Sequence, residues 1–165
     1  MVMAGGGCGG EASSTSTTRG APRVGQSESG QVTGSLGKFG VRANAAQEKA
    51  AAEALVGYQR ARVDREWRLA CSYVSLPARR LLLKAVEHMP GQQNVSCPKA
   101  LATFLSVPPP SQRDDFLTVD PVVLKLKGST GILVYHGGEA DEYAIQMIVE
   151  DRDWKVGSLA PVPLS

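Results

Sequence analysis

The sequence has no apolar run long enough to cross a bilayer, which takes about 18 residues, and it has few of the residues that usually carry chemistry. Its 165 residues include two histidines and three cysteines, with no Cys-x-x-Cys motif and no cluster of cysteine with histidine. We therefore expect no zinc or other metal and no cofactor. No glycine-rich loop stands between an expected strand and helix, and no Gly-x-Ser-x-Gly motif occurs. Neither a phosphate cradle nor a hydrolase elbow is expected.

An excess of charge of one sign is also missing from most of the chain. Residues 44–165 carry 14 Lys or Arg and 14 Asp or Glu, so the formal charge of +2 comes from the residues before them. Nucleic-acid-binding domains usually have a clear basic excess. We therefore expect no nucleic-acid partner.

Charges within this neutral stretch are nevertheless unevenly placed. Acidic residues dominate 139–153, and residues 58–86 are basic through Arg60, Arg62, Arg65, Arg68, Arg79, Arg80 and Lys84. We interpret both groups as solvated faces that compensate each other. The alternative is a basic helical face that lies against an anionic membrane surface.

Glycine and small hydroxyl residues are concentrated at the start of the chain. Residues 1–43 hold 11 of the 18 glycines and 10 Ser or Thr, with few large apolar residues. Such a stretch buries too little surface to offset the entropy of ordering it. We predict a disordered leader and tether over 1–43 and a single domain over 44–165.

Cys8 lies in this leader, after three glycines and before a Ser/Thr run over 13–18. A secretory signal needs a basic start and an apolar stretch, and neither is present in the leader. A small-residue run into a lone cysteine nevertheless resembles the end of a bacterial lipoprotein signal, although Gly5 stands where such signals have an aliphatic residue. The resemblance implies a lipid on Cys8 and a membrane anchor outside the cytoplasm. The alternative is an incidental cysteine in a cytoplasmic leader.

Apolar residues recur every three or four positions before the proline triplet at 108–110 and predict four helices. We expect these over 44–63, 64–74, 75–89 and 96–105, with Asp64 as the cap of the second. Their expected buried stripes are Ala51, Leu55 and Tyr58; Trp67, Ala70, Cys71 and Val74; Ala78, Leu81, Leu82, Ala85 and Met89; and Cys97, Leu101, Phe104 and Leu105.

The apolar spacing changes to every second residue after the proline triplet. It predicts strands over 122–127, 132–136, 143–149 and 154–156, separated by short glycine-rich or acidic turns. Short links between strands imply antiparallel pairing. Helices followed by such strands predict an α+β fold with the helices packed on one face of the sheet.

Cys71 and Cys97 lie inside two of the expected helices. Two cysteines in one domain of an exported protein usually meet, so export would make them a disulfide. The alternative is a pair of buried, reduced cysteines that act as small apolar side chains. Neither has a histidine in its own segment, so we expect no catalytic thiol.

Several short motifs and their order resemble one known family. These motifs are Asp64-Arg65-Glu66-Trp67, Ala70-Cys71-Ser72, Leu76-Pro77-Ala78-Arg79, Cys97-Pro98-Lys99-Ala100-Leu101 and Glu150-Asp151-Arg152-Asp153-Trp154-Lys155-Val156. Together they resemble the nuclear-transport-factor-2-like, or cystatin-like, α+β domains of actinobacterial secreted lipoproteins. The resemblance implies a curved antiparallel sheet of about four strands around a long helix, with a cone-shaped cavity between them.

Trp67, Tyr135, Met147 and Trp154 are the candidates to line such a cavity, although we interpret both tryptophans first as core anchors. Enzymes of this superfamily place a carboxylate or histidine in the cavity, and His136 is a weak candidate for such a general base. Its position at a strand end favours an ordinary surface residue. We therefore assign no catalytic residue.

We interpret the chain as a non-catalytic, extracytoplasmic lipoprotein of the cell envelope. Its domain would bind a protein partner or a small apolar ligand, and the open face of its sheet is a candidate surface for a homodimer. The alternatives are a small cavity enzyme of the isomerase or dehydratase type and a cytoplasmic interaction module.

Overall fold

The computed structural model describes residues 37–90 and 94–164, so Cys8 lies outside the described residues. Within them the chain forms five α-helices: α2 (Ala45–Val63), α3 (Trp67–Tyr73), α4 (Leu76–Glu87), α5 (Cys97–Phe104) and α6 (Arg113–Leu117). The six described strands are β1 (Val41–Arg42), β2 (Asp120–Lys127), β3 (Thr130–His136), β4 (Glu142–Glu150), β5 (Asp153–Val156) and β6 (Val162–Pro163). Short 3-10 helices cover Pro110–Gln112 and Gly138–Ala140. The predicted α+β class is confirmed.

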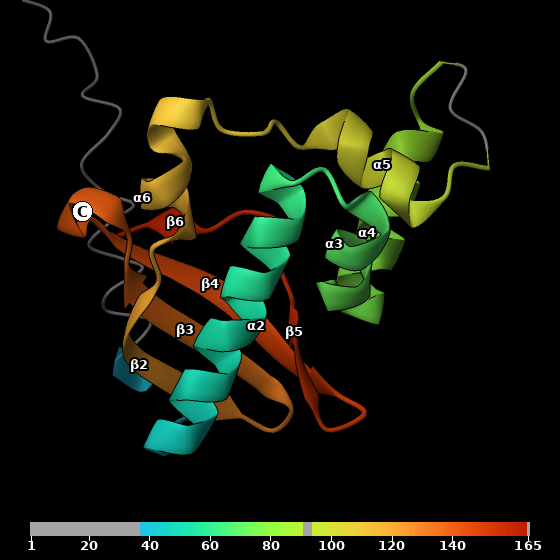
Figure 1. Ribbon diagram of the computed structural model, residues 1–165. Helices are drawn as coiled ribbons and strands as arrows, with labels where there is room; N and C mark the ends of the chain where they lie inside the picture. The colour runs from blue at the N-terminus through green and yellow to red at the C-terminus, as the bar shows by residue number, and fades with distance from the viewer. Residues whose placement is uncertain (1–36, 91–93, 165) are drawn as a thin grey trace, which may run out of the picture.

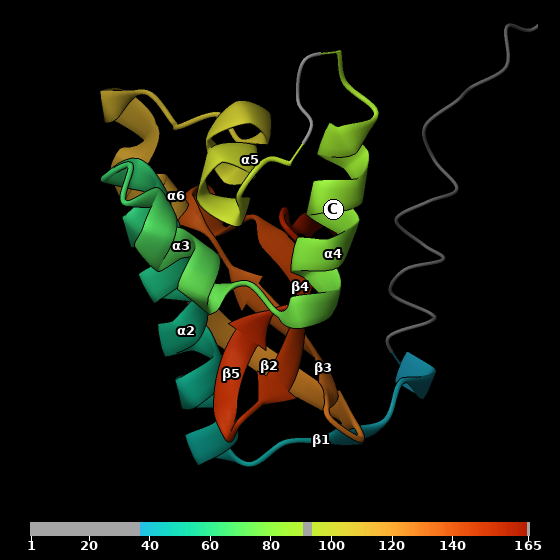
Figure 2. The same cartoon turned by 90° about the vertical axis from the view of Figure 1, so that its right-hand side faces the viewer.

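The strands form one open antiparallel sheet in the order β1-β2-β3-β4-β5, with β6 paired to β4. The four predicted strands correspond to β2 through β5, and the two-residue strands β1 and β6 add to them. Helix α2 crosses one face of the sheet, and α3, α4 and α5 gather on the β5 side (Figure 1). Turning the molecule shows these three helices above β5, with α6 behind them (Figure 2).

Helix α2 begins at a reciprocal cap. The Asn44 side chain accepts from the Gln47 backbone N–H at 2.9 Å, and the Gln47 side chain accepts from the Asn44 N–H at 3.1 Å. Both bonds satisfy donors that a helix start otherwise leaves unpaired. The side chains of Asn44 and Gln47 therefore stabilise the helix start that the sequence predicts.

The predicted role of Asp64 as the cap of the second helix is wrong. Arg65 adopts a left-handed conformation (φ 58), and the Glu66 N–H donates to the Ala61 carbonyl at 2.8 Å. The Arg65 N–H donates to the Arg62 carbonyl at 3.1 Å, which completes a Schellman-type end of α2. Asp64 therefore caps the C-terminus of α2, and Glu66 precedes α3.

The core lies between α2, the other helices and one sheet face. Its fully buried side chains include Leu55, Tyr58, Val74, Val86, Leu101, Leu124, Leu133, Met147 and Val156. A smaller cluster of Val134, Ala144 and Leu164 lies on the opposite sheet face, with Val123 and Ile132 packed against it. The homodimer expected on that face stays a prediction.

The expected stripe on α4 is only partly correct. Ala78 and Leu82 are buried as expected, but Leu81 and Met89 are exposed and Val86 is buried in their place. Residues 78, 82 and 86 share one face of a helix, just as the residues of the predicted stripe do. The apolar pattern alone did not choose between the two faces.

The ordered sheet begins before residue 44, inside the stretch that composition assigns to the tether. Val41 and Arg42 pair with β2, and Ala43 is buried. The Glu48 carboxylate accepts from Arg42 Nε at 3.2 Å and from the Leu124 N–H at 3.3 Å. These contacts occupy an edge of β2 that would otherwise expose unpaired backbone groups.

Candidate functional site

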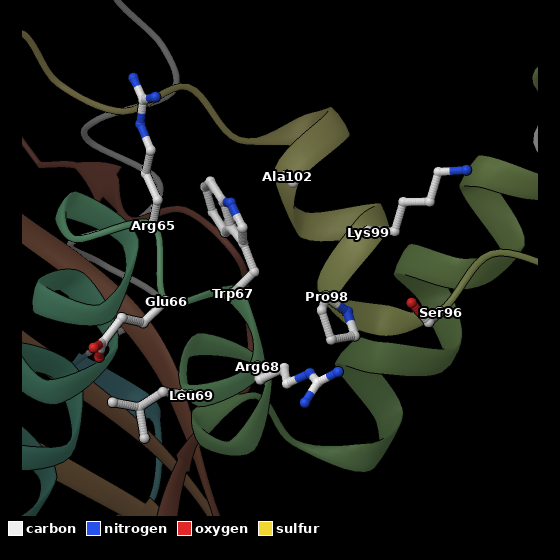
Figure 3. Close-up of a pocket in the computed structure, with 9 residues that line it drawn as sticks. All are labelled: Arg65, Glu66, Trp67, Arg68, Leu69, Ser96, Pro98, Lys99 and Ala102. Atoms are coloured by element: carbon white, nitrogen blue, oxygen red, sulfur yellow. The ribbon is translucent and has the colours of Figure 1, made fainter.

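A groove of about 730 Å³ lies between α3 and α5. The residues that line it are Arg65, Glu66, Trp67, Arg68, Leu69, Ser96, Pro98, Lys99 and Ala102 (Figure 3). Its surface combines a tryptophan, a proline and small or branched apolar groups with three cations and one acid. Concave sites of this mixed character are common binding sites in proteins.

The half-buried Trp67 is the central feature of the groove. Figure 3 shows its indole standing beside α5, opposite Ala102, while the Arg68 side chain extends toward Pro98. The carboxylate of Glu66, the one acid among the lining residues, points away from Trp67. The groove therefore offers an aromatic surface next to positive charge.

The Cys71–Cys97 disulfide joins the two helices that form this groove. Its Cα atoms lie 6.1 Å apart, and it connects α3 to the first residue of α5. The predicted disulfide is therefore confirmed. The bond holds α3 and α5 together close to Pro98 and so limits how far the groove can open.

A second unusual arrangement lies inside the molecule, around Arg62 on α2. The side chain belongs to a residue that is only 7% exposed, and none of the ion pairs among the described residues includes it. The guanidinium carbon lies 5.4 Å from the centre of the Tyr58 ring and 4.8 Å from that of Phe116. Two aromatic rings thus take the place that a carboxylate usually has beside a buried arginine.

Hydrogen bonding around Arg62 is incomplete. Its Nη2 donates to the Ser106 carbonyl at 3.2 Å, but Nε has no partner within the described part of the chain. Gln59, one turn earlier and 3% exposed, likewise has a buried Oε1 without a partner there. Buried polar atoms are nearly always paired, so two unpaired atoms on one face of α2 call for an explanation.

Burial perturbs the ionisation of the side chains around Arg62. We call the group of Arg62, Gln59, Tyr58, Tyr135 and Phe116 the Arg62 cluster. Loss of solvent lowers the pKa of Arg62 and raises the pKa of Tyr58. Burial, with repulsion from Tyr143 as the next cause, raises the pKa of Tyr135 to about 12, and the nearby Gln59 side chain opposes that shift. The cluster therefore combines a poorly solvated cation with phenols that stay neutral.

Phe116 packs against Arg62 and is also a lining residue of an open pocket of about 410 Å³. The pocket is lined by Pro108, Ser111, Gln112, Asp115, Phe116, Gly138, Asp141 and Tyr143. Tyr143 stacks on Tyr135, with ring centres 5.7 Å apart. One side of the Phe116 ring therefore covers Arg62, and the residue also forms part of the pocket wall.

The four candidates for a cavity lining do not meet in one cavity. Trp67 lines the groove between α3 and α5, whereas Trp154 lines a separate pocket of about 350 Å³ with Tyr73. Tyr135 and Met147 are buried in the core. Of these four residues, only Tyr135 belongs to the Arg62 cluster.

His136 lies at the end of β3, opposite Asp120 and Glu142 in the strand register. It shares a sheet face with Val134, whose side chain packs with Leu164 rather than with α2. Leu133 and Tyr135 point to the opposite face, into the main core. The histidine is therefore separated by the sheet from the Arg62 cluster.

Sequence reasoning missed Arg62, Gln59 and Phe116. It placed Arg62 among solvated cations, but the residue lies seven positions after Leu55 and four after Tyr58, on the stripe that was predicted to be buried. That spacing could have identified it. Phe116 belongs to a five-residue helix in a stretch for which we predicted neither helix nor strand.

Within residues 37–90 and 94–164, no group of three or more His, Cys, Asp or Glu is placed to hold a metal ion. No helix in these ranges has the length and apolar character to span a membrane. Comparisons with protein-family models, curated proteins and solved structures found no match to this chain, and the family resemblance stays a prediction.

Proposed function

We propose that this chain is a non-catalytic binding protein of the cell envelope, whose domain holds an acidic, apolar-containing segment of a partner protein in the groove between α3 and α5. The single observation that carries the proposal is Trp67, placed beside α5 in a groove with Arg65, Arg68 and Lys99. Tryptophan and arginine are enriched among residues that dominate protein interfaces. Positive charge at the rim selects for acidic partners.

The disulfide supports a binding role for this groove. A partner loses less affinity to ordering when the groove is held in its binding shape beforehand. Cys71–Cys97 fixes the two walls relative to each other. The placement of His136 on the other side of the sheet supports a non-catalytic role, because that residue was the sequence's one candidate base.

The disulfide also supports a location outside the cytoplasm, since such bonds persist mainly in oxidising compartments. The proposed anchor is a lipid on Cys8, which rests on the residues around that cysteine. In the producing cell, the wild-type chain should fractionate with membranes and incorporate labelled fatty acid. A C8S variant should do neither. Equal fractionation of both would remove the anchor from the proposal.

A peptide-selection experiment tests the groove directly. We would select a random-peptide phage library on the folded, oxidised domain and on a W67A variant as the counter-target. The proposal predicts acidic sequences with a large apolar residue that bind wild type and lose about tenfold or more in affinity for W67A, as expected for an aromatic anchor.

R68E should also lower the affinity of the domain for these peptides. The exposed Arg80 on α4 offers a matched charge control. R80E should bind as wild type does. Recovery of no peptides, or of peptides that bind W67A and wild type equally, would overturn the proposed site.

A further inference from the structure

We infer that Arg62, Gln59 and Tyr135 form a second binding site, closed by Phe116, for a small carboxylate that carries an apolar body and a hydrogen-bond donor next to its carboxylate. This site is independent of the groove between α3 and α5. Its residues come from the C-terminal end of α2 and from β3, and none of them lines that groove.

The argument begins with the cost of burying Arg62. A buried cation is strongly unfavourable unless it is paired and fully hydrogen-bonded. Here the guanidinium makes one hydrogen bond to the Ser106 carbonyl and stacks on two rings, while its Nε donor is unpaired in the described structure. An anionic acceptor would satisfy both the charge and the free donor.

Gln59 sets a second requirement for the ligand. Its side chain lies near the Tyr135 hydroxyl and lowers the pKa of that phenol, and its Oε1 acceptor is unpaired among the described residues. Gln59 and Arg62 are three positions apart on α2 and therefore lie on the same face of the helix. A ligand that bridges them needs an acceptor for Arg62 and, close to it, a hydroxyl or N–H donor for Gln59.

Phe116 shows both where the ligand enters and what its body resembles. The ring covers Arg62 at 4.8 Å and also lines the 410 Å³ pocket beside Tyr143. If α6 moves this ring aside, the pocket and the Arg62 cluster become continuous. The space that the ring leaves suits a phenyl or similar apolar group, with the carboxylate directed at the guanidinium.

Carboxylate is the group that fits this cation best. Arginine presents planar donors that match the two oxygens of a carboxylate, and such charge-assisted bonds are stronger than neutral ones. Phenyllactate has all three required parts: a phenyl ring, a carboxylate and an adjacent hydroxyl. 3-Phenylpropionate lacks the hydroxyl, and 3-phenylpropane-1,2-diol lacks the carboxylate, so the three compounds form a matched series of probes.

Calorimetric titration of the oxidised domain with these probes tests the inference. We expect phenyllactate to bind more tightly than 3-phenylpropionate and the diol to bind most weakly. F116A, which removes the covering ring, should bind phenyllactate more tightly than wild type does. R62M, which keeps the apolar stem but removes the charge, should lose about ten- to a hundredfold in affinity.

Two controls separate this site from general effects. R60M removes the same charge from an exposed position on α2 and should bind as wild type does, and so should W67A, which alters the groove. Cooperative unfolding of R62M and F116A would show that both remain folded. Binding that is equal in R62M and wild type, or absent for all three probes in F116A, would overturn the inference.

Discussion

Arg62 and Phe116 cover each other, with the guanidinium carbon of Arg62 4.8 Å from the centre of the Phe116 ring. The arginine comes from the long helix α2, and the phenylalanine comes from α6, a helix of five residues. This contact links the buried Arg62 to the 410 Å³ pocket that Phe116 lines. It also places a cation where most domains have apolar side chains.

Replacement of Arg62 by methionine should leave stability unchanged or raise it. Methionine keeps most of the side-chain volume and removes a desolvated charge, and such exchanges are often neutral or stabilising by about 1–4 kcal/mol. R62A should be less stable than R62M because it leaves a cavity. Urea unfolding of both variants measures the difference. A clear loss of stability in R62M would mean that Arg62 stabilises the fold.

Stability should fall at high pH because of Tyr135. Burial raises its pKa from the ordinary value of 10.0 to about 12 in the folded chain. The unfolded chain therefore releases this proton first, and the stabilising contribution is complete below about pH 10 and is lost as the pH rises toward about 12. The expected loss is about 2–3 kcal/mol.

The matched variant for this pH effect is Y135F. Its free energy of unfolding should decline less than that of wild type over the same pH range. Tyr58, whose pKa burial also raises, should retain part of the effect. Chemical unfolding at a series of alkaline pH values provides the measurement. Identical declines in Y135F and wild type would show that other groups cause the pH dependence.

Loss of the Cys71–Cys97 disulfide should destabilise the domain substantially. The bond closes a loop with a sequence separation of 26, for which the chain-entropy model gives about 3.5 kcal/mol. A C71S/C97S double variant should unfold at a correspondingly lower denaturant concentration. Thiol titration of the unfolded wild-type domain, before and after reduction, should show two additional thiols only after reduction. Stability that is equal with and without the bond would contradict this account.

Substitution of Gly138 by alanine should displace α6. A Cβ atom at this glycine would lie 2.5 Å from the Asp115 Cα, which is backbone and cannot simply rotate away. Overpacking of this kind typically costs about 1–3 kcal/mol. Because Asp115 precedes Phe116, G138A should also loosen the ring over Arg62 and raise the affinity for phenyllactate. G37A is the control, since no heavy atom of the residues that the structure describes lies within 4 Å of its added Cβ.

The architecture could be predicted from the sequence because long apolar patterns determine it. The alternation Tyr143, Ile145, Met147 places one whole strand face in the core, and Leu55 and Tyr58 do the same for α2. Short elements carry no such pattern. The two residues of β1 and the five of α6 depend on tertiary contacts, including the Glu48 bonds to Arg42 and Leu124.

The candidate sites were harder to predict, for reasons that particular residues show. Trp67 was among the candidates for a cavity lining, but its partner surface on α5 comes from residues about 30 positions later, brought close by a disulfide whose pairing depended on the export argument. Arg62 was assigned to solvent by its charge alone. Its burial depends on Phe116 and Ser106, whose positions no local spacing determines.

The most direct test of the proposed groove follows the indole N–H resonances of the two tryptophans during titration with a peptide selected on the domain. Trp67 and Trp154 line different pockets, so their signals report on different surfaces. We predict that the Trp67 indole and the backbone amides of α5 shift together and saturate, while the Trp154 indole remains unchanged. Shifts centred on Trp154 or on the Arg62 cluster, with Trp67 unaffected, would contradict the proposed binding site.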